Sequence, residues 1–453
     1  MIRSPGLFAV LMIFTAWASQ ASAQDSWSPK TEAFDFNLGG SATDGTYLYL
    51  FGGNQQGTAS TFPDYHRQLR RYDPVSDAWA TLEPMPVYSQ YNAGAYCNGR
   101  LYSFGGYNQN GILDTIQAYT IATNAWEALD VTLSVPRYHL VAATIGNRIY
   151  VIGGYFMGAS NVNEDFNTLN NSVTFRANMP SWLYWQAIAT LNGRVHVIGG
   201  YGQGGPSAAN YEYTPPDNSS PQGSWAIRSP IENSLGQIQP RMGAAAFVRN
   251  GLIHVTGGWN GDTFTDTWIY DRPTDGWVLG AAMNQPRNFH AAAAIGGLGY
   301  VYGGGVAPAI TTGEKYGPNG PPTADAGPDQ TVAWSGNQDT AVTLDGTGST
   351  DPDDDALTYQ WVGSQVSASV PTPTINLPLG THTITLTVTD PLGEEATDTV
   401  VISIVDLSPP PGGDDGSDDG GGGGGGGCGS VGLDLMLPLM VIALWRKKVA
   451  ARA

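Results

Sequence analysis

The sequence predicts an all-β protein in which one small sheet is repeated six times and a second β domain follows. Three observations support this fold class. A strand-like segment that ends in two glycines recurs six times, its copies are evenly spaced, and most copies are followed by an aromatic pair. The 453 residues include 60 glycines, 22 tyrosines and 13 tryptophans but only 13% charged residues, which is typical of strands joined by tight turns.

The six glycine-ended segments are short, apolar and closely similar. They read YLFGGN from Tyr49, LYSFGGY from Leu101, IYVIGGY from Ile149, VHVIGGY from Val195, IHVTGGW from Ile253 and YVYGGG from Tyr300. The glycine pairs begin at residues 52, 105, 153, 199, 257 and 303. A period of about 50 residues indicates a repeat architecture. One such sheet cannot bury both of its faces alone, so the six sheets must stack around an axis to share a core.

A second landmark follows most of the glycine pairs. An aromatic residue usually comes 12 or 13 residues later, or 19 residues later in the case of Tyr72, and a tryptophan stands seven residues beyond it in YDPVSDAW, YTIATNAW and YDRPTDGW. These residues resemble the kelch family over residues 24–320. The resemblance implies a six-bladed β-propeller in which each repeat forms one four-stranded blade. The third repeat departs from the pattern, with Phe166 and Val173 at the two aromatic positions.

The N-terminus supplies the aromatic residue that the sixth repeat lacks. No tryptophan follows Tyr316 at the expected distance, whereas Trp27 precedes the first glycine pair by 25 residues. The corresponding distance from Trp79 to Gly105 is 26 residues. We therefore expect the segment around Trp27 to form the outer strand of the last blade and to close the ring.

Residues 321–406 alternate apolar and polar side chains between turns, which predicts a small β-sandwich. Trp361 and the strand GTHTITLTVTD resemble Ig-like domains of the PKD type, which implies a spacer or accessory module. Asp351, Asp353 and Asp355 have a spacing that could gather oxygen ligands for calcium. An EF-hand loop would need Gly and Glu where Ala356 and Val362 stand, so a solvated turn is the alternative.

The first 23 residues are typical of a secretory signal peptide. Arg3 precedes an apolar stretch, and Ala21-Ser22-Ala23 provides a cleavage site after Ala23. The apolar stretch is too short for a membrane span. We expect export through the inner membrane, with signal peptidase as a processing partner.

The C-terminal end has three consecutive parts. Residues 407–430 form a linker rich in glycine and aspartate, and residues 431–453 combine a short apolar segment with a basic tail. Together with Cys428, this order resembles the C-terminal sorting signals of Gram-negative bacteria. The resemblance implies a sorting protease as partner, lipid attachment or cleavage at Cys428, and a location at the cell surface, in the outer membrane or outside the cell. A permanent single-span membrane anchor is the alternative.

The composition and the loops of the implied propeller limit the choice of ligand. A formal net charge of −19 excludes nucleic acid, because phosphate binding requires a basic surface. In a propeller, the loops that lead into the innermost strands share one face with the loops that follow the second strands. We call the loop that leads into an innermost strand the first loop of its repeat. Three first loops contain an arginine 16 residues before a glycine pair: Arg137, Arg241 and Arg287.

Aromatic residues and histidines accompany these arginines on the same face. They are Tyr107, Tyr155, Tyr201 and Trp259 directly after glycine pairs, and His139, Trp185 and His290 in the first loops. Arginines donate forked hydrogen bonds, and flat rings cover the apolar faces of sugars, so the set predicts binding of an extracellular glycan or a surface protein. The alternative for the arginines is structural, since arginine at this position belongs to the general kelch pattern.

Catalysis has less support. Galactose-oxidase-type kelch enzymes need copper ligands and a modified tyrosine, but Cys97 is the only cysteine of the repeats and no cluster of metal ligands is visible. The kelch resemblance also includes six-bladed bacterial sialic acid mutarotases, which would need a carboxylate as general acid–base. Glu164, Asp165 and Asp262 are in suitable loops, although acids in exposed turns are usually solvated.

The sequence therefore predicts an exported binding protein of the cell surface, with no cofactor expected except possible calcium at the three aspartates. Two other functions remain open. One is an enzyme that acts on sugars without copper, such as a mutarotase or epimerase. The other is an adhesive or matrix protein in which the second β domain contributes as much as the propeller.

Overall fold

The computed structural model describes residues 25–408, except 32, 33, 35, 54–66, 306–309, 337, 354, 364 and 365. The signal peptide with Ala23, almost all of the linker, Cys428 and the C-terminal segment lie outside the described residues. Within this range the protein is all-β, and its one short helical element is the 3-10 turn η2 (Ile121–Thr123). No helix in the described range is long and apolar enough to cross a membrane.

Six four-stranded sheets form the propeller and confirm the predicted fold class. Each sheet is a blade, and the strands run from the innermost to the outermost. Blade 1 has β2 (Gly40–Thr43), β3 (Leu48–Phe51), β4 (Leu69–Asp73) and β5 (Ala78–Leu82); blade 2 has β6 (Ala93–Cys97), β7 (Arg100–Asn108), β8 (Gly111–Thr120) and β9 (Ala125–Thr132); blade 3 has β10 (Val141–Ile145), β11 (Arg148–Ile152), β12 (Asn163–Asn167) and β13 (Ser172–Phe175).

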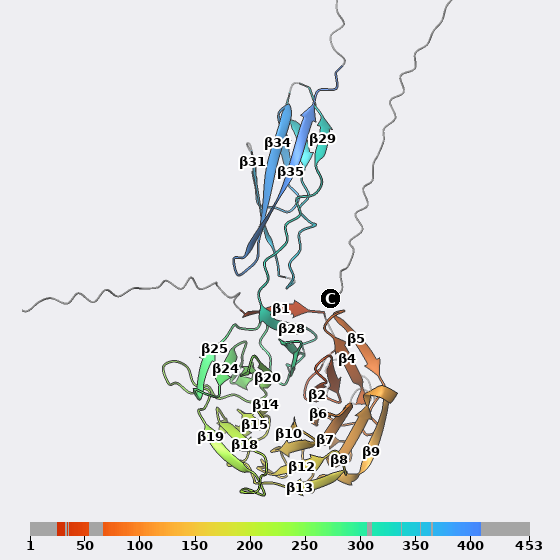
Figure 1. Ribbon diagram of the computed structural model, residues 1–453, viewed down its shortest axis with the longest axis vertical. Helices are drawn as coiled ribbons and strands as arrows, with labels where there is room; N and C mark the ends of the chain where they lie inside the picture. The colour runs from red at the N-terminus through yellow and green to blue at the C-terminus, as the bar shows by residue number, and fades with distance from the viewer. Residues whose placement is uncertain are drawn as a thin grey trace, which may run out of the picture. The chain divides into compact units, whose positions relative to one another are not determined.

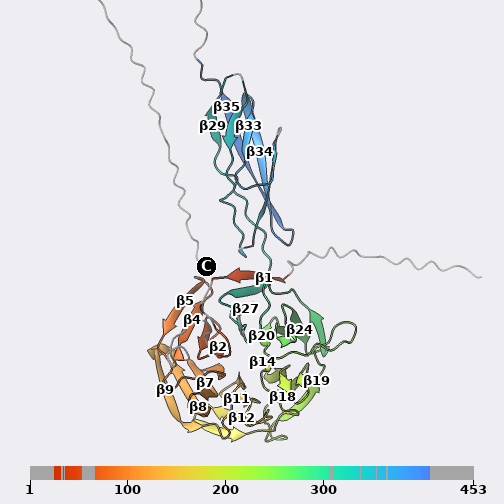
Figure 2. The same cartoon turned by 180° about the vertical axis from the view of Figure 1, so that it is seen from behind.

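The remaining blades follow the same antiparallel order. Blade 4 has β14 (Ala187–Leu191), β15 (Arg194–Ile198), β18 (Asn210–Thr214) and β19 (Ser224–Arg228); blade 5 has β20 (Ala245–Arg249), β21 (Leu252–Thr256), β24 (Thr267–Asp271) and β25 (Gly276–Leu279); blade 6 has β26 (Ala291–Ile295), β27 (Leu298–Tyr302), β28 (Gly313–Pro318) and β1 (Asp25–Lys30). Figure 1 and, from behind, Figure 2 show these blades around one axis, with β2, β14 and β20 near the centre.

The first strand of the described chain closes the ring. β1 pairs antiparallel with β28, and Trp27 lies opposite Tyr316. This is the pairing that the spacing of Trp27 predicts. Trp27 is buried, and its Nε1 donates to Thr267 Oγ1 and to the carbonyl of Ala281, both at 3.1 Å, so β1 also contacts blade 5.

The core of the propeller lies between neighbouring blades. One apolar cluster, for example, joins Ala95 and Phe104 of blade 2 to Ile149 and Phe166 of blade 3. Phe166 is therefore buried at the position that holds a tyrosine in most of the other repeats. Because flat sheets stack through such clusters, no blade has a complete core of its own.

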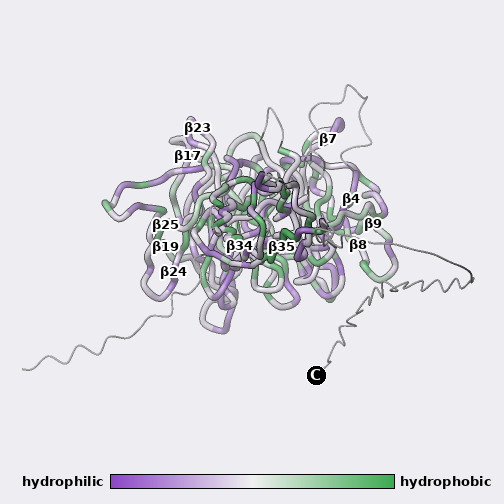
Figure 3. Tube along the Cα trace, turned by 90° about the horizontal axis from the view of Figure 1, so that it is seen from above, coloured by the Kyte–Doolittle hydropathy of each residue, from purple (hydrophilic) through white to green (hydrophobic). Residues whose placement is uncertain are grey.

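Short hairpins mark one face of the ring. β16 (Tyr201–Gly202) pairs with β17 (Gly205–Pro206), and β22 (Trp259–Asn260) pairs with β23 (Asp262–Thr263). In Figure 3, which colours the trace by hydropathy, β17, β23 and the end of β7 lie on the same side of the ring. We call this side the loop face, since it carries the segments that follow the glycine pairs.

The second β domain has two sheets. The larger contains β29 (Gln330–Ala333), β35 (Glu395–Val405), β34 (Gly380–Thr389), β31 (Thr358–Gly363) and β32 (Val366–Ala368) in that order; the smaller pairs β30 (Thr340–Thr343) with β33 (Thr374–Leu377). Trp361 is fully buried between them, together with Leu386 and Ile402. The alternating residues of β34 and β35 supply this core, as expected for a sandwich.

Candidate functional site

The loop face brings the predicted aromatic residues into register with the loops that enter the innermost strands. Isolated antiparallel bridges pair Tyr138 with Tyr155, Tyr184 with Tyr201, Gln90 with Tyr107 and Met242 with Trp259. Each bridge joins the residue after a glycine pair to the first loop of the same blade. The sequence therefore located both sets of loops on one face.

Five tyrosines of blades 2 to 4 form a continuous row, which we call the aromatic arc. Its members are Tyr107, Tyr138, Tyr155, Tyr184 and Tyr201. Successive ring centroids lie 5.8, 5.4, 5.3 and 5.5 Å apart. Such tilted contacts stabilise the rings against one another and keep their edges and faces at fixed angles.

The arc carries no formal charge at neutral pH. Burial raises the pKa of Tyr138 and of Tyr184, and neighbouring tyrosines raise both pKa values further. In the described part of the chain, the five hydroxyl groups make no hydrogen bond to another protein group. They can therefore donate to, or accept from, a ligand.

Beneath the arc, six residues form a closed circle of backbone hydrogen bonds, which we call the central ring. Each N–H donates to the carbonyl of its counterpart in a neighbouring blade, over 2.6 to 3.4 Å. The members, in order, are Leu38, Tyr91, His139, Trp185, Gly243 and Phe289, and the last accepts from Leu38. All six adopt a left-handed backbone conformation. The ring therefore holds the six loops together where they enter the channel.

Side chains of the central ring fill the axis on the loop face. The ring centroid of His139 lies 4.3 Å from that of Tyr91 in a tilted contact and 4.7 Å from that of Trp185 in an edge contact, and Trp185 contacts Phe289 at 5.2 Å. Trp185 Nε1 donates to His139 Nδ1 over 2.6 Å. Burial lowers the pKa of His139 to about 3, so the imidazole stays neutral. His139 and Trp185 also pack against the arc, since their ring centroids lie 4.6 Å from that of Tyr138 and 4.7 Å from that of Tyr184, respectively.

A cavity of about 520 Å³ lies along the axis between the inner strands. Small and hydroxylated side chains dominate its lining, and no aspartate, glutamate, lysine or arginine contributes to it. Thr144 Oγ1 donates to the carbonyl of Tyr96, and Thr190 Oγ1 donates to the carbonyl of Thr144, so these two hydroxyls link neighbouring inner strands.

The structure places the three predicted arginines in the interior, which corrects their expected role at a ligand. Arg137, Arg241 and Arg287 are fully buried, and each donates from Nη1 to the carbonyl of the first glycine of a pair, at 2.7 to 2.9 Å. Their acidic partners are Glu164, Asp266 and Glu314, respectively. The guanidinium groups hold the glycine turns of the loop face, which is the structural alternative.

His290 and the acids considered for catalysis are also engaged or distant. His290 is buried, its Nε2 lies 2.8 Å from Thr256 Oγ1, and burial lowers its pKa to about 3. Glu164 accepts from Arg137 and from the backbone of Ser134. Asp165 is buried between two arginines, while Asp262 is exposed in the β22–β23 hairpin. No predicted acid is both free and close to the arc.

Cys97 lies at the end of β6, in the interior. Its sulfur is 3.4 Å from the carbonyl of Gly146 and 3.6 Å from Thr168 Oγ1. The thiol is buried and unbridged. It therefore packs as a small core residue, away from the arc.

Three carboxylates gather in the second β domain. Asp351, Asp355 and Asp390 place one ligand oxygen each within 4.8 Å of the others. Asn319, 3% exposed, donates from Nδ2 to Asp390 Oδ2 over 2.6 Å and leaves its own Oδ1 buried without a partner. Burial and repulsion from Asp351, Asp353 and Asp390 raise the pKa of Asp355 to about 6. These oxygen donors fit the preference of Ca²⁺.

Asp353 does not join that group. Its carboxylate accepts from the backbone of Gly320 and from Lys315 Nζ, both at 2.6 Å. The predicted set of Asp351, Asp353 and Asp355 is thus corrected by replacing Asp353 with Asp390. Asp390 is 35 residues away from Asp355 in sequence, and β34 carries it back to the same end of the sandwich.

Two members of the arc escaped the sequence prediction. Tyr138 lies between the predicted residues Arg137 and His139, and Tyr184 directly precedes the predicted Trp185. Their common place, three residues before an inner strand, was a usable signal. Trp259 was predicted, but it pairs with Met242 in blade 5 and makes no ring contact with the arc in the described range.

The fold and the loop face define a propeller of the kelch-repeat class. Residues 95–304 match the family model described as the KLHDC2/KLHL20/DRC7 Kelch-repeats domain, and residues 319–404 match the PKD domain model. The chain therefore contains a Kelch-repeat domain followed by a PKD domain. Such a pair of domains fits a role in binding a protein or a surface.

Similar proteins share only part of this architecture. Kelch-like protein 35 of Mus musculus is 35% identical over 89 residues, which are 19% of this chain and 15% of that protein. Kelch-like protein 38 of Mus musculus is 31% identical over 117 residues, 25% of this chain and 19% of that protein. The chain thus spans less than a fifth of the length of these relatives. The solved structure of YjhT has a TM-score of 0.53 at 17% identity, covering 63% of this chain and 95% of that chain, and shares the fold.

Proposed function

We propose that the protein is an exported binding protein that recognises a neutral glycan on the aromatic arc. The observation that carries this proposal is the arc itself: five neutral rings in a row, whose hydroxyls bond to no protein group among the described residues. Rings at fixed angles cover the apolar faces of sugars, and phenolic hydroxyls bond to sugar hydroxyls.

Exposed apolar side chains beside the arc favour an extended ligand over a single sugar. Phe156 and Met157 follow Tyr155, and they are 40% and 89% exposed. Trp182, two residues before Tyr184, is 50% exposed. An exposed apolar surface of this kind marks a contact site, and here it lies in the same loops of blades 3 and 4 as Tyr155 and Tyr184.

A glycan array probed with the full chain tests the proposal. We expect selective binding of neutral oligosaccharides, and we expect the Tyr155→Ala/Tyr184→Ala variant to lose at least about tenfold in affinity, equivalent to about 1.4 kcal/mol. Phe175→Ala is the matched control, because Phe175 is an exposed aromatic residue on the outer strand β13, outside the arc. Binding should change little with salt, since the arc is neutral.

Two results would contradict this assignment. If no neutral oligosaccharide binds to the intact chain, the glycan proposal fails and a protein ligand takes its place. If Phe175→Ala weakens binding as much as the arc variant does, the arc is not the site.

Export and C-terminal processing are part of the proposal. The signal-peptide pattern that ends at Ala23 and the sorting-signal pattern around Cys428 support them. Mass spectrometry of the protein from its native host should find an N-terminus at Gln24 and either cleavage or lipid attachment near Cys428. A chain that keeps Met1 and its last residue would overturn both assignments.

We also propose that the PKD domain binds calcium through Asp351, Asp355 and Asp390. The convergence of their oxygens and the unpaired Oδ1 of the buried Asn319 support this ligand set. Bound calcium would stabilise the end of the sandwich where the chain enters it, because Asn319 precedes the first strand of the domain.

A further inference from the structure

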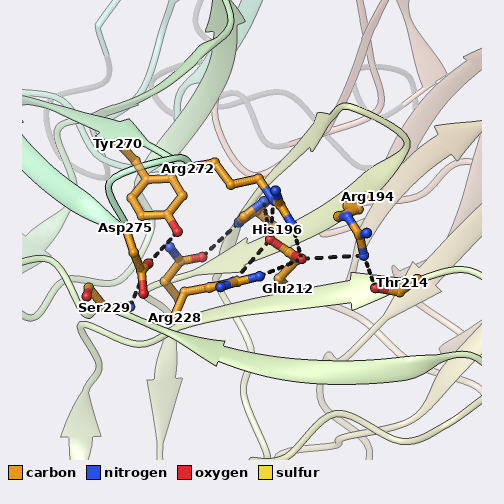
Figure 4. A network of polar contacts seen from close by, with 10 residues as sticks. Arg194, His196, Glu212, Thr214, Arg228, Ser229, Tyr270, Arg272 and Asp275 are labelled. Carbon is orange, nitrogen blue, oxygen red and sulfur yellow. Dashed lines mark hydrogen bonds and ion pairs between the residues drawn. The ribbon is translucent and has the colours of Figure 1, made fainter.

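One buried carboxylate between blades 4 and 5 is surrounded by three arginine side chains. Glu212, on β18, is 1% exposed. Arg228 donates to it from Nε and Nη2 at 3.1 and 3.0 Å, and Arg272 donates from the same two atoms at 2.7 and 3.0 Å. Arg194 Nη1 lies 3.6 Å from Oε1. Figure 4 shows the three guanidinium groups converging on Glu212.

Blade 3 contains the same arrangement with one arginine fewer. Asp165, on β12, is also fully buried and pairs with Arg148 and Arg176, each at 2.8 Å. Arg148 is the first residue of β11, as Arg194 is of β15 in blade 4. Arg176 directly follows the outer strand of blade 3, β13, and Arg228 is the last residue of the outer strand of blade 4, β19. Two arginines therefore suffice to bury a carboxylate at this position of a blade.

The third arginine comes from the neighbouring blade. Arg272 follows β24 in the segment YDRPTDGW of blade 5, two residues after Tyr270. The residues at this place in blades 1, 2 and 4 are Pro74, Ile121 and Pro215, which carry no charge. Arg272 is thus a local addition, not a part of the repeat.

The network keeps a surplus of positive charge at the surface. Asp275 is the second carboxylate nearby, and it accepts from Tyr270 and from the backbone of Ser229. His196 stays neutral, because burial lowers its pKa. Three guanidinium groups thus face two carboxylates, in a chain whose formal net charge is −19.

The arginines are also reachable from solvent. The side chains of Arg228 and Arg272 are each 27% exposed, and that of Arg194 is 34% exposed. Arg228 and Arg272 hold Glu212 through the edge formed by Nε and Nη2. Their Nη1 atoms have no protein acceptor within the described ranges, so both guanidinium groups keep donors for a second oxyanion.

We propose that Arg272, with Arg228 and Arg194, forms a binding site for a carboxylate or sulfate oxyanion, at the seam between blades 4 and 5. The carboxylate or sulfate group would accept from the outer edges of the guanidinium groups, which are suited to two oxygens at once. Glu212 positions Arg228 and Arg272 by accepting from their Nε and Nη2 atoms, whereas Nη1 of Arg194 donates to Thr214 Oγ1. This site is separate from the aromatic arc and does not depend on the function proposed for it.

Titration of the full chain with three size-matched oligosaccharides tests the site. The probes are a sulfated heparin fragment, an oligogalacturonate and a neutral dextran oligosaccharide. Isothermal titration calorimetry measures their binding at about 20 mM and about 300 mM salt. We expect the sulfated or the carboxylated probe to bind and its affinity to fall as the salt concentration rises. In the Arg272→Gln variant, this affinity should be at least about tenfold lower than in the parent. The two acidic probes distinguish sulfate from carboxylate.

Arg148→Gln is the matched control, because it removes an exposed arginine from the equivalent cluster of blade 3. It should leave the affinity unchanged. Arg272→Lys keeps the positive charge but loses the two parallel N–H donors of the guanidinium group, so this variant should bind the probe more weakly than the parent. It replaces Arg272→Gln in the test if Arg272→Gln does not fold. Equal losses in Arg148→Gln and Arg272→Gln, or no binding of either acidic probe at low salt, would overturn the proposal.

Discussion

Nε1 of Trp185 donates a hydrogen bond to Nδ1 of His139, and the two atoms lie 2.6 Å apart. A ring nitrogen that accepts a hydrogen bond carries no proton, so His139 is a neutral imidazole whose proton is on Nε2. Both residues belong to the central ring, directly below the aromatic arc. Protonation of His139 at Nδ1 would therefore break its hydrogen bond to Trp185, a residue that packs against the aromatic arc.

Acid should destabilise the propeller through His139. Its pKa is about 3 in the folded protein and about 6.5 in an unfolded chain, so the unfolded state binds more protons as the pH falls between these values. Stability is then lost from about pH 6.5 downward, by at most about 1.4 kcal/mol per pH unit for one histidine. Melting temperatures measured from pH 7.5 to pH 4 should fall less steeply in His139→Asn, which tolerates the left-handed backbone. Parallel curves for the variant and the parent would contradict this coupling.

Removal of the buried Arg137 side chain should strongly destabilise the propeller. Arg137 and Glu164 are both fully buried, and Arg137→Met would leave the carboxylate of Glu164 without its ion pair. We expect a loss of about 3–5 kcal/mol in the free energy of unfolding, measured in urea. The double variant Arg137→Met/Glu164→Gln should lose less than the sum of the two single variants, since no unpaired charge remains. A loss below about 1 kcal/mol in Arg137→Met would show that the pair is dispensable.

The sequence predicted the blades well because the repeat depends on backbone conformation. Gly153 and Gly154 both have positive φ angles, of 64° and 102°. A side chain at either position would meet atoms of the neighbouring loop, so glycine recurs visibly in every copy. The closing strand was predictable for a similar reason, because Trp27 fills a place between blades that other tryptophans fill in their own repeats.

The direction of the arginines could not be predicted in the same way. Sequence position placed Arg137 in a loop of the correct face, but its acceptors include the carbonyl of Gly153, and a carbonyl oxygen is present at every residue. The spacing therefore could not distinguish a guanidinium that turns inward from one that faces a ligand. The aromatic arc was found only in part, because Tyr138 meets Tyr155 through a bridge inside blade 3 and Tyr184 meets it through the packing of blade 4 on blade 3.

Trp27 should be essential to closure. It is 4% exposed, donates two hydrogen bonds to blade 5 and packs against Phe247 and Tyr316. Trp27→Ala should therefore lower the free energy of unfolding by about 3–5 kcal/mol. Denaturation followed by tryptophan fluorescence and by circular dichroism gives this value. A change within about 0.5 kcal/mol would mean that the ring is stable without this contact.

Gly243 should resist substitution more than Gly146, a glycine with a similar backbone conformation. Its φ is +64°, and an added Cβ would lie 2.7 Å from the ring of Phe289. Gly146 has a φ of +58° and no atom within 4 Å of the corresponding Cβ, so Gly146→Ala measures the backbone cost alone, about 1–2 kcal/mol. Gly243→Ala should cost a further 1–3 kcal/mol or so, because it overpacks the central ring. Equal losses in the two variants would show that Phe289 moves aside freely.

Calcium should stabilise the PKD domain, and Asp390 should be required for this effect. The three carboxylates repel one another without a cation, and that repulsion contributes to the raised pKa of Asp355. We expect the melting temperature of the domain to rise when millimolar Ca²⁺ replaces EDTA, since a ligand that binds only the folded state stabilises it. Asp390→Asn should abolish the rise, while Asp345→Asn, an aspartate on an exposed turn of the same domain, should keep it. Because the metal competes with protons for Asp355, the rise should also weaken as the pH falls below about 6. A melting temperature that is the same in EDTA and in Ca²⁺ would exclude these carboxylates as a calcium site.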